Sequence, residues 1–251
     1  MFLELLDLTP LQIIFSIIII FVAYTVKGLS GFGSGLIAIP LLAFIFPLTF
    51  IVPVLGLLSY SGTIMQSFHL RKQVVWSDLW PVIPFSMLGV VIAVWLLVNV
   101  DANYLVLALG VFVLSYSIYS LLPLPVHAGG RRWAIAAGFG GGMVGALFGT
   151  GGPFYVVYLK IRQLDKNQFR ATIAMIFLID GGARMASYAA HGLYTAQVLW
   201  LVLMMFPVLF AGMYVGHHLH IKMEQQRFNQ VISILLIVSG IVLIVKSLSK
   251  L

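Results

Sequence analysis

The stretch GFGGGMVGALFGTGGP at residues 138–153 holds eight glycines in sixteen positions, and its other residues are apolar or small. Glycine this dense weakens a helix, because it costs backbone entropy and offers no side chain to pack. Inside a bilayer, backbone that is not helical is tolerated only where protein or a water-filled cavity surrounds it. The stretch therefore predicts close helix packing, followed by a broken element whose amide groups face a binding cavity.

The composition of the whole chain places this stretch in a membrane. Of its 251 residues, 61% are hydrophobic and only 8% are charged. Soluble domains are about 25% charged, so we expect an all-α, multi-pass protein of the cell (plasma) membrane. The basic residues behind the net charge of +7 sit mainly in short loops, as an orientation signal would, and do not indicate nucleic-acid binding. The absence of cysteine excludes disulfides and cysteine-based metal sites.

Ten apolar segments can be drawn along the chain. A membrane-spanning helix needs about 20 residues, with a range of about 17–25, and most segments meet this length. The second and the seventh are short, and each directly follows a glycine cluster. Short, glycine-interrupted segments at matching places in two halves indicate the binding site of a transporter. The segments are 11–27, 32–46, 48–67, 79–98, 103–122, 133–149, 152–161, 171–190, 196–217 and 228–248.

The two halves of the chain match each other. Residues 31–35 (GFGSG), followed by LIAIPLL, align with residues 149–153 (GTGGP), followed by FYVVYL, at an offset of 118 (149 minus 31). Such internal similarity predicts a duplicated unit of about five segments. The expected organisation is a first transmembrane repeat at residues 1–122, a linker at 123–132 and a second transmembrane repeat at 133–251.

The charges between the segments predict how the repeats are oriented. The loops after segments three, five, seven and nine carry Lys and Arg, whereas the alternate loops at 47, 99–102 and 191–195 carry none. By the positive-inside rule the basic loops are cytoplasmic and the N-terminus lies outside. Five crossings per repeat is an odd number, so the second repeat is expected to be inverted. This arrangement places Lys246 and Lys250 on the outer side, against the positive-inside rule. If the glycine motifs are instead re-entrant hairpins, each repeat has three full spans, which is also an odd number.

Two charges stand within one apolar segment. Asp180 and Arg184 are four residues apart, so they share a helix face and can pair. Each charge near a helix centre costs roughly 2.5–3.5 kcal/mol on insertion scales, which makes both functional-site candidates. In the functional interpretation Arg184 binds an anion, while Asp180 neutralises it when the site is empty or takes a coupling proton. A structural ion pair is the alternative.

The glycine motifs are the other candidates. The N-terminal end of a helix presents free N–H groups and a partial positive charge, so it attracts anions. Ser34 and Thr150 add hydroxyl donors at the same turns, and Lys27 either faces the anion pathway or reaches the inner membrane surface. Packing of small residues is the alternative, favoured for Gly138, Gly142 and Gly145. The candidate substrate-binding residues are Lys27, Gly31, Gly33, Ser34, Gly35, Gly149, Thr150, Gly151, Gly152 and Arg184.

At its glycine motifs the chain resembles the TauE/SafE family of membrane permeases, also called the sulfite exporter family. The family hallmark is a repeated G-x-G-(G)-x, an apolar pair and a Pro-Leu close. The first copy here reads GLSGFGSGLIAIPLL and the second GALFGTGGPFYVVYL. In the second copy Tyr158 stands where the first has Pro40, and Pro153 stands where it has Gly35. The resemblance implies transport of sulfite, organosulfonates or related small anions.

We therefore expect a secondary transporter of small sulfur-containing or carboxylate anions that works by alternating access about the repeat interface. No nucleotide-binding motif is present, so transport is not expected to use ATP directly. No enzyme activity, cofactor or metal site is expected. An anion channel and an intramembrane enzyme are the alternatives, although Ser34 lacks the first glycine of a G-x-S-G motif. The expected partners are the anionic solute and the lipid bilayer, with a homo-oligomer left open.

Overall fold

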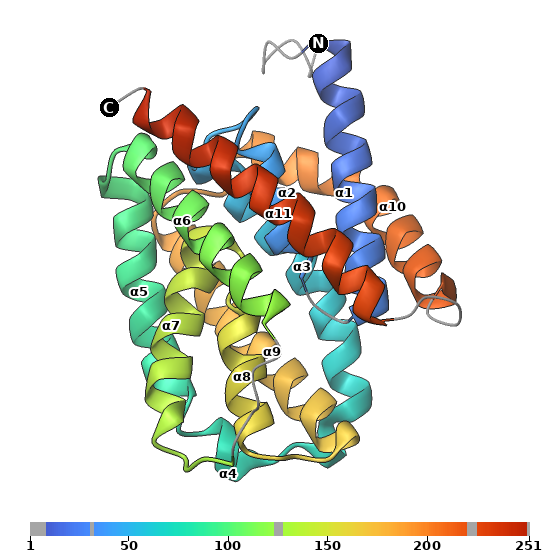
Figure 1. Cartoon of the computed structure of the whole chain (residues 1–251), viewed down its shortest axis with the longest axis vertical. Coiled ribbons are helices and arrows are strands. Elements are labelled where there is room, and N and C mark those ends of the chain that lie inside the picture. The colour runs from blue at the N-terminus through green and yellow to red at the C-terminus, as the bar shows by residue number, and fades with distance from the viewer. Residues whose placement is uncertain (1–8, 31–32, 123–127, 220–224, 250–251) are drawn as a thin grey trace.

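The computed structural model describes residues 9–30, 33–122, 128–219 and 225–249, and helices account for most of them (Figure 1). The helices of the first half are α1 (Pro10–Ser30), α2 (Ser34–Leu42), α3 (Leu48–Leu70), the 3-10 helix η2 (Arg71–Gln73), α4 (Trp76–Leu79), α5 (Ile83–Asn99) and α6 (Ala102–Leu121). Those of the second half are α7 (Trp133–Phe148), α8 (Gly152–Ile161), α9 (Lys166–Ala190), α10 (Ala196–Leu219) and α11 (Gln225–Leu248).

All ten predicted segments correspond to a long or short helix, and the fold is that of a multi-pass membrane protein. Within the described ranges, four helices are long and apolar enough to cross a membrane, over residues 10–29, 102–121, 167–190 and 196–216. The prediction missed the single turn of α4. It also began α9 five residues too late, because Asp165 caps that helix by accepting hydrogen bonds from the backbone N–H groups of Asn167 and Gln168, both at 2.9 Å.

Large apolar side chains cover the outside of the molecule. Half or more of the surface is exposed for Val91 and Trp95 on α5 and for Leu203 and Tyr214 on α10. In water such a surface would drive association, whereas lipid is its natural solvent. The exposed residues therefore agree with the composition in placing the helices within the bilayer.

The predicted breaks are observed at both glycine motifs. Helix α7 ends at Phe148, where Gly149 has a φ of 62°, and α8 begins only at Gly152. In the first half, Gly33 has a φ of 94° directly before α2 begins. Both values are in the left-handed region, which glycine enters without the steric cost that a side chain adds. Gly31 lies outside the described residues.

The two breaks meet each other. A Cβ atom added to Gly35 would collide with the backbone carbonyl group of Gly149, and one added to Gly149 would meet the side chain of Ile39. Glycine is therefore required at Gly35 by contact with backbone and at Gly149 by its left-handed conformation. This close approach brings the N-terminal end of α2 beside the loop that leads into α8.

Close helix pairs also depend on glycine. A Cβ atom at Gly138 would meet the carbonyl oxygen of Val82, and one at Gly142 that of Ser86, so α7 lies directly against α5. Gly216 of α10 approaches the carbonyl oxygen of Thr25 on α1 in the same way. The packing role predicted for Gly138 and Gly142 agrees with this arrangement. Gly145 differs, because a Cβ atom there would find its nearest neighbours outside α7 in Arg184 and Gly151.

The two predicted repeats interleave. Helix α1 of the first half packs on α10 of the second, and α7 of the second packs on α5 of the first. Helices α3 and α9 pack against each other, as do α6 and α11, which lie side by side in Figure 1. In each of these pairs a helix of one half packs on a helix of the other half. Two copies of a unit related by a two-fold axis would pack in this way. The inverted relation of the repeats and their boundaries stay a prediction.

A buried carboxylate ties together three loops at one end of the molecule, the lower end in Figure 1. Asp78 of α4 is 2% exposed, and its Oδ1 atom pairs with Arg131 Nε at 3.1 Å and Arg162 Nε at 2.9 Å. Arg162 also donates to the carbonyl oxygen of Gly129 at 2.7 Å, and Tyr158 donates to that of Asp78 at 3.2 Å. The loops predicted to be cytoplasmic after segments five and seven are thus joined to α4.

Lys246, which contradicted the positive-inside pattern, has a structural partner. Its Nζ atom donates to the carbonyl oxygen of Phe44 at 3.3 Å and lies 5.1 Å from the centre of the Phe44 ring. Phe44 directly follows the end of α2, where helix carbonyl groups carry a partial negative charge. Lys246 thus contacts the segment that follows α2, and the orientation of the repeats stays a prediction.

Replacement of Gly142 by alanine tests the close contact of α5 and α7. The new methyl group would overlap the backbone of Ser86, and overpacking of this kind costs about 1–3 kcal/mol. We expect the purified G142A protein to melt at a lower temperature in detergent than wild type. Gly130→Ala is the control, since a Cβ atom there meets nothing within 4 Å. Equal melting temperatures for the two variants would contradict the packing role.

Candidate functional site

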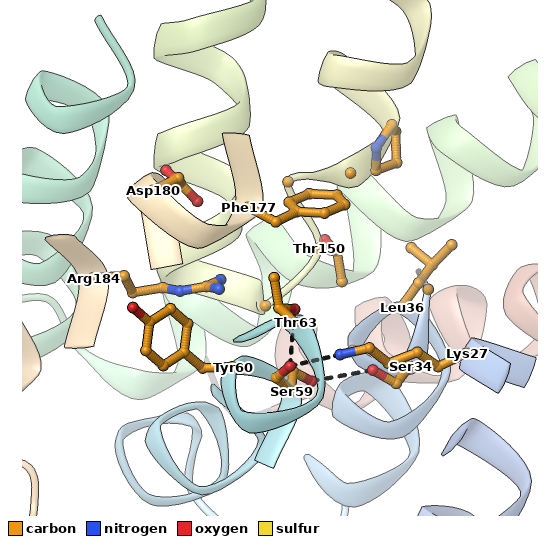
Figure 2. Close-up of a pocket in the computed structure, with 16 residues that line it drawn as sticks. Lys27, Ser34, Leu36, Ser59, Tyr60, Thr63, Thr150, Phe177, Asp180 and Arg184 are labelled. Atoms are coloured by element: carbon orange, nitrogen blue, oxygen red, sulfur yellow. Dashed lines mark hydrogen bonds between the residues drawn. The ribbon is translucent and has the colours of Figure 1, made fainter. Parts of the chain in front are cut away.

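The two helix breaks enclose a cavity of about 60 Å³ in the interior of the molecule (Figure 2). Ten of the eleven residues predicted for substrate binding or coupling line it, from α1, α2, the α7–α8 break and α9. A cavity needs roughly 10–15 Å³ of this kind of volume to hold one water, so the space admits a few waters or one compact solute. The ten residues are Lys27, Gly33, Ser34, Gly35, Gly149, Thr150, Gly151, Gly152, Asp180 and Arg184.

Lys27 forms the first-half wall together with α3. Its side chain is 6% exposed, and its Nζ atom donates to the carbonyl oxygen of Ser59 at 2.6 Å. The same carbonyl oxygen accepts from Thr63 Oγ1 at 3.0 Å, and the Oγ atoms of Ser34 and Ser59 are 3.1 Å apart. Lys27 thus lines the cavity, and its place in an anion pathway stays a prediction.

Arg184 forms the opposite wall. Its Nη1 atom donates to the carbonyl oxygen of Gly145 at 2.6 Å, on the last turns of α7. Its Nε atom is buried and has no hydrogen-bond partner. Figure 2 shows Arg184 and Lys27 reaching toward the cavity from opposite sides, one from each half of the chain. Two cations thus converge on a space that holds at most one small solute.

Asp180 and Arg184 do not form an ion pair, so the alternative interpretation of a structural ion pair is not observed. Asp180 is 2% exposed, and its Oδ1 atom accepts from Ser86 Oγ at 2.6 Å and from Tyr155 Oη at 3.1 Å. Both ion pairs found among the described residues involve Asp78. The spacing of four residues permits a pair on an isolated helix, but here α5 and α8 supply hydrogen-bond donors that draw Asp180 away.

Thr150 has no hydrogen-bond partner. The residue is 4% exposed, and its Oγ1 atom is buried without a contact to any donor or acceptor. The large majority of buried polar side-chain atoms are hydrogen-bonded, so each exception needs an explanation. Thr150 Oγ1 and Arg184 Nε are the two such atoms in the described part of the chain, and both residues line the same cavity.

The electrostatics of the cavity favour a negative solute. Helices α2 and α8 both begin at its wall, with Ser34 and Gly152 as their first residues. The first N–H groups of a helix have no partner within it and carry a partial positive charge. Together with Lys27 and Arg184 they outweigh the single carboxylate of Asp180. A small anion with several hydrogen-bond acceptors matches this lining.

Sequence reasoning missed several residues of the site. Ser59, Tyr60 and Thr63 line the cavity from α3, and Phe177 lines it from α9. The signal was available in the run SYSGT at residues 59–63, a polar interruption of an apolar segment. Ser86 and Tyr155, which hold Asp180, gave no comparable signal, because a single serine or tyrosine in an apolar helix has no evident partner until the helices are assembled.

Comparisons with known proteins agree on the class of protein. The model of a family described as "Sulfite exporter TauE/SafE" matches residues 16–243. A protein of Comamonas testosteroni described as "Probable inner membrane transporter protein TsaS" is 24% identical over 181 residues, which cover 68% of this chain and 72% of that protein. No solved structure gives a significant match.

Proposed function

The chain belongs to the sulfite exporter TauE/SafE family of membrane transporters, and we propose that it moves small anions across the inner membrane by alternating access. The similarity to a protein named as an inner membrane transporter supports the location and the general activity. The substrate we propose is sulfite, an organosulfonate or a related sulfur-containing or carboxylate anion. The family description supports the sulfur-containing members of this group.

The unpartnered atoms of Thr150 and Arg184 carry this proposal. A buried donor without a partner costs about 1–3 kcal/mol, and here two such atoms belong to residues that line one cavity. The cost is recovered when a bound solute accepts both hydrogen bonds. An anion does so most favourably, because hydrogen bonds between ionised groups are roughly twice as strong as neutral ones.

The size of the cavity favours a compact anion. A volume of about 60 Å³ leaves little room beside the rings of Tyr60 and Phe177, which also line the cavity. A sulfite or a small sulfonate fits this description better than an anion with a bulky apolar group. Tyr60 and Phe177 are then the residues that limit the length of any substituent on the anion.

Asp180 is the group that we propose takes a coupling proton. It lines the same cavity as the two cations, so its charge bears directly on the solute. When Asp180 is ionised, its negative charge and the positive charges of Lys27 and Arg184 sum to a net charge of plus one around the cavity. A proton on Asp180 raises this to two, which favours a dianion. Ser86 and Tyr155 can remain hydrogen-bonded to the carboxyl group in either state, since a hydroxyl both donates and accepts.

Alternating access requires two halves that can rearrange around a fixed site. The exchange of partners between the halves, with α1 on α10 and α7 on α5, supports a two-fold-related pair of moving units. The anion would lie between them, held by Lys27 on one side and Arg184 on the other. A channel would need a continuous path instead, and flux measurements separate the two.

Replacement of Arg184 by glutamine tests the anion site. Hydrogen bonds to charged groups contribute about 1.5–3 kcal/mol, so we expect the apparent affinity for sulfite in proteoliposome counterflow to fall about 10- to 100-fold. The control is Lys72→Gln at an exposed residue of η2, and this variant should behave like wild type. Full counterflow by R184Q protein would contradict the site, and sulfite flux that neither saturates nor shows counterflow would indicate a channel.

Replacement of Thr150 by valine separates binding from stability. Valine keeps the shape but removes a hydroxyl that has no partner in the protein, so T150V protein should melt no lower than wild type, while its affinity for sulfite falls about 2- to 10-fold. Thr172→Val is the matched control. Thr172 Oγ1 accepts from the backbone N–H of Val75 at 3.0 Å, away from the cavity, so this variant should lose stability and keep its affinity. The reverse pattern would count against the site.

Replacement of Asp180 by asparagine tests coupling. Asparagine preserves an oxygen for Ser86 and Tyr155 but cannot carry the proton, so sulfite-driven acidification or alkalinisation of the proteoliposome lumen should disappear. Sulfite counterflow, which needs no net proton movement, should persist. Asp101→Asn is the control, since Asp101 is an exposed cap of α6 and asparagine caps equally well. Proton movement that survives in D180N protein would exclude Asp180 as the coupling group.

A further inference from the structure

A second hollow, an apolar groove of about 490 Å³, lies between α6, α7 and α8. Its walls carry six aromatic side chains, and its volume falls within the range of about 300–1,000 Å³ typical of sites that hold small-molecule ligands. The aromatic residues are Phe112, Tyr116, Tyr119, Trp133, Phe154 and Tyr158. The transport mechanism proposed above makes no use of this space.

The groove runs from the middle of the helices to one end of the molecule. Pro153 and Phe154, at the start of α8, line one part of it, and Ile161, at the end of α8, lines another. Eight residues of helix separate Pro153 from Ile161, which corresponds to about 12 Å. One leaflet of the hydrocarbon core is about 15 Å deep. The groove therefore has the depth that a single acyl chain of one leaflet occupies.

The groove opens to the surface that faces lipid. Trp133 is 49% exposed and Tyr119 is 41% exposed, although both line the groove. In the other direction the ring of Phe112 stacks on those of Phe148 and Phe154, with centroids 6.2 and 6.3 Å apart, and joins α6 to α7 and α8. A hollow with these walls, in contact with a bilayer, is accessible to acyl chains and unfavourable for water.

Two exposed cations lie next in sequence to residues that line the groove. Arg132 directly precedes Trp133, and Lys160 directly precedes Ile161, while the N–H of Gly129 donates to the carbonyl oxygen of Ile161 at 3.1 Å and keeps the two segments together. Arg132 and Lys160 are exposed, and neither makes an ion pair or side-chain hydrogen bond within the described ranges. Their neighbours Arg131 and Arg162 are instead committed to Asp78.

We propose that the groove binds one acyl chain of an anionic phospholipid, whose phosphate is held by Lys160 and Arg132. The apolar walls select the chain, and the two free cations select a negative headgroup. Trp133 and Tyr119 also line the groove and are exposed, and residues of these types are enriched at the headgroup level of membrane proteins. This lipid site does not depend on which solute the cavity carries.

The site is linked to the transport cavity through α8. Pro153 lines both the groove and the cavity, and Phe154 follows it on the groove side. An acyl chain beside Phe154 stabilises α8 in the position where its first residues meet the solute. Binding of lipid and of solute are then coupled, and each raises the affinity for the other by the same factor.

Native mass spectrometry of delipidated protein, titrated with dioleoyl phosphatidylglycerol or dioleoyl phosphatidylcholine, tests the proposal. We expect one phosphatidylglycerol to bind roughly 10- to 30-fold more tightly than phosphatidylcholine, the preference that two cations near a membrane surface provide. The double variant K160Q/R132Q should lose this preference and still bind both lipids weakly. Lys72→Gln, an exposed lysine that does not line the groove, should retain it.

A variant that fills the groove tests its apolar part. Ala136 lines the groove and is exposed, so Ala136→Phe should abolish tight binding of both lipids. Ala211→Phe is the matched control, since Ala211 is an exposed residue of α10 that does not line the groove. Equal binding by A136F and A211F proteins would overturn the proposal, as would a wild-type protein without preference between the two lipids. Sulfite counterflow by the same variants separates loss of the lipid site from loss of the anion site.

Discussion

A helix that stops inside a bilayer leaves peptide groups without partners, and the arrangement of this protein follows from enclosing two such stops. Lipid cannot hydrogen-bond these groups, so the rest of the chain must cover them or provide something that can. The long helices α1, α3, α9 and α10 form much of the enclosure, and glycines on α7 and α10 let neighbouring helices approach closely enough to exclude lipid. The enclosed space between the stops is the cavity.

The polar side chains around the cavity have most, but not all, of their hydrogen-bonding groups paired within the protein. Lys27 and Arg184 each hold a backbone carbonyl group, and Asp180 holds two hydroxyl groups. Each ionised group thus has at least one partner in the empty protein, which keeps the cost of burial moderate. The hydroxyl of Thr150 and the Nε–H of Arg184 remain without a partner, and both residues line the cavity. In the proposed function, a solute completes this nearly satisfied set of hydrogen bonds.

Much of the fold could be predicted from the sequence, because lipid imposes simple rules on composition and length. The apolar segments and both breaks were predictable, since glycine clusters interrupt otherwise continuous apolar runs, and the structure brings the predicted residues of both motifs to one cavity. The partner of Asp180 was not predictable. Spacing along α9 pointed to Arg184, but Ser86 on α5 and Tyr155 on α8 hold the carboxylate instead. Contacts between helices far apart in sequence decide such a choice, and no local pattern reports them.

The backbone contact between Gly35 and Gly149 has a consequence for the stoichiometry of the protein. Two copies of a glycine motif could form two separate binding sites for solute, one per repeat. The two copies touch with no side chain between them, and the N-terminal ends of α2 and α8 both lie at the same cavity. Two negative solutes bound there would repel each other at close range. In the proposed function the two motifs therefore form one shared binding site, and a transport cycle carries a single solute per polypeptide.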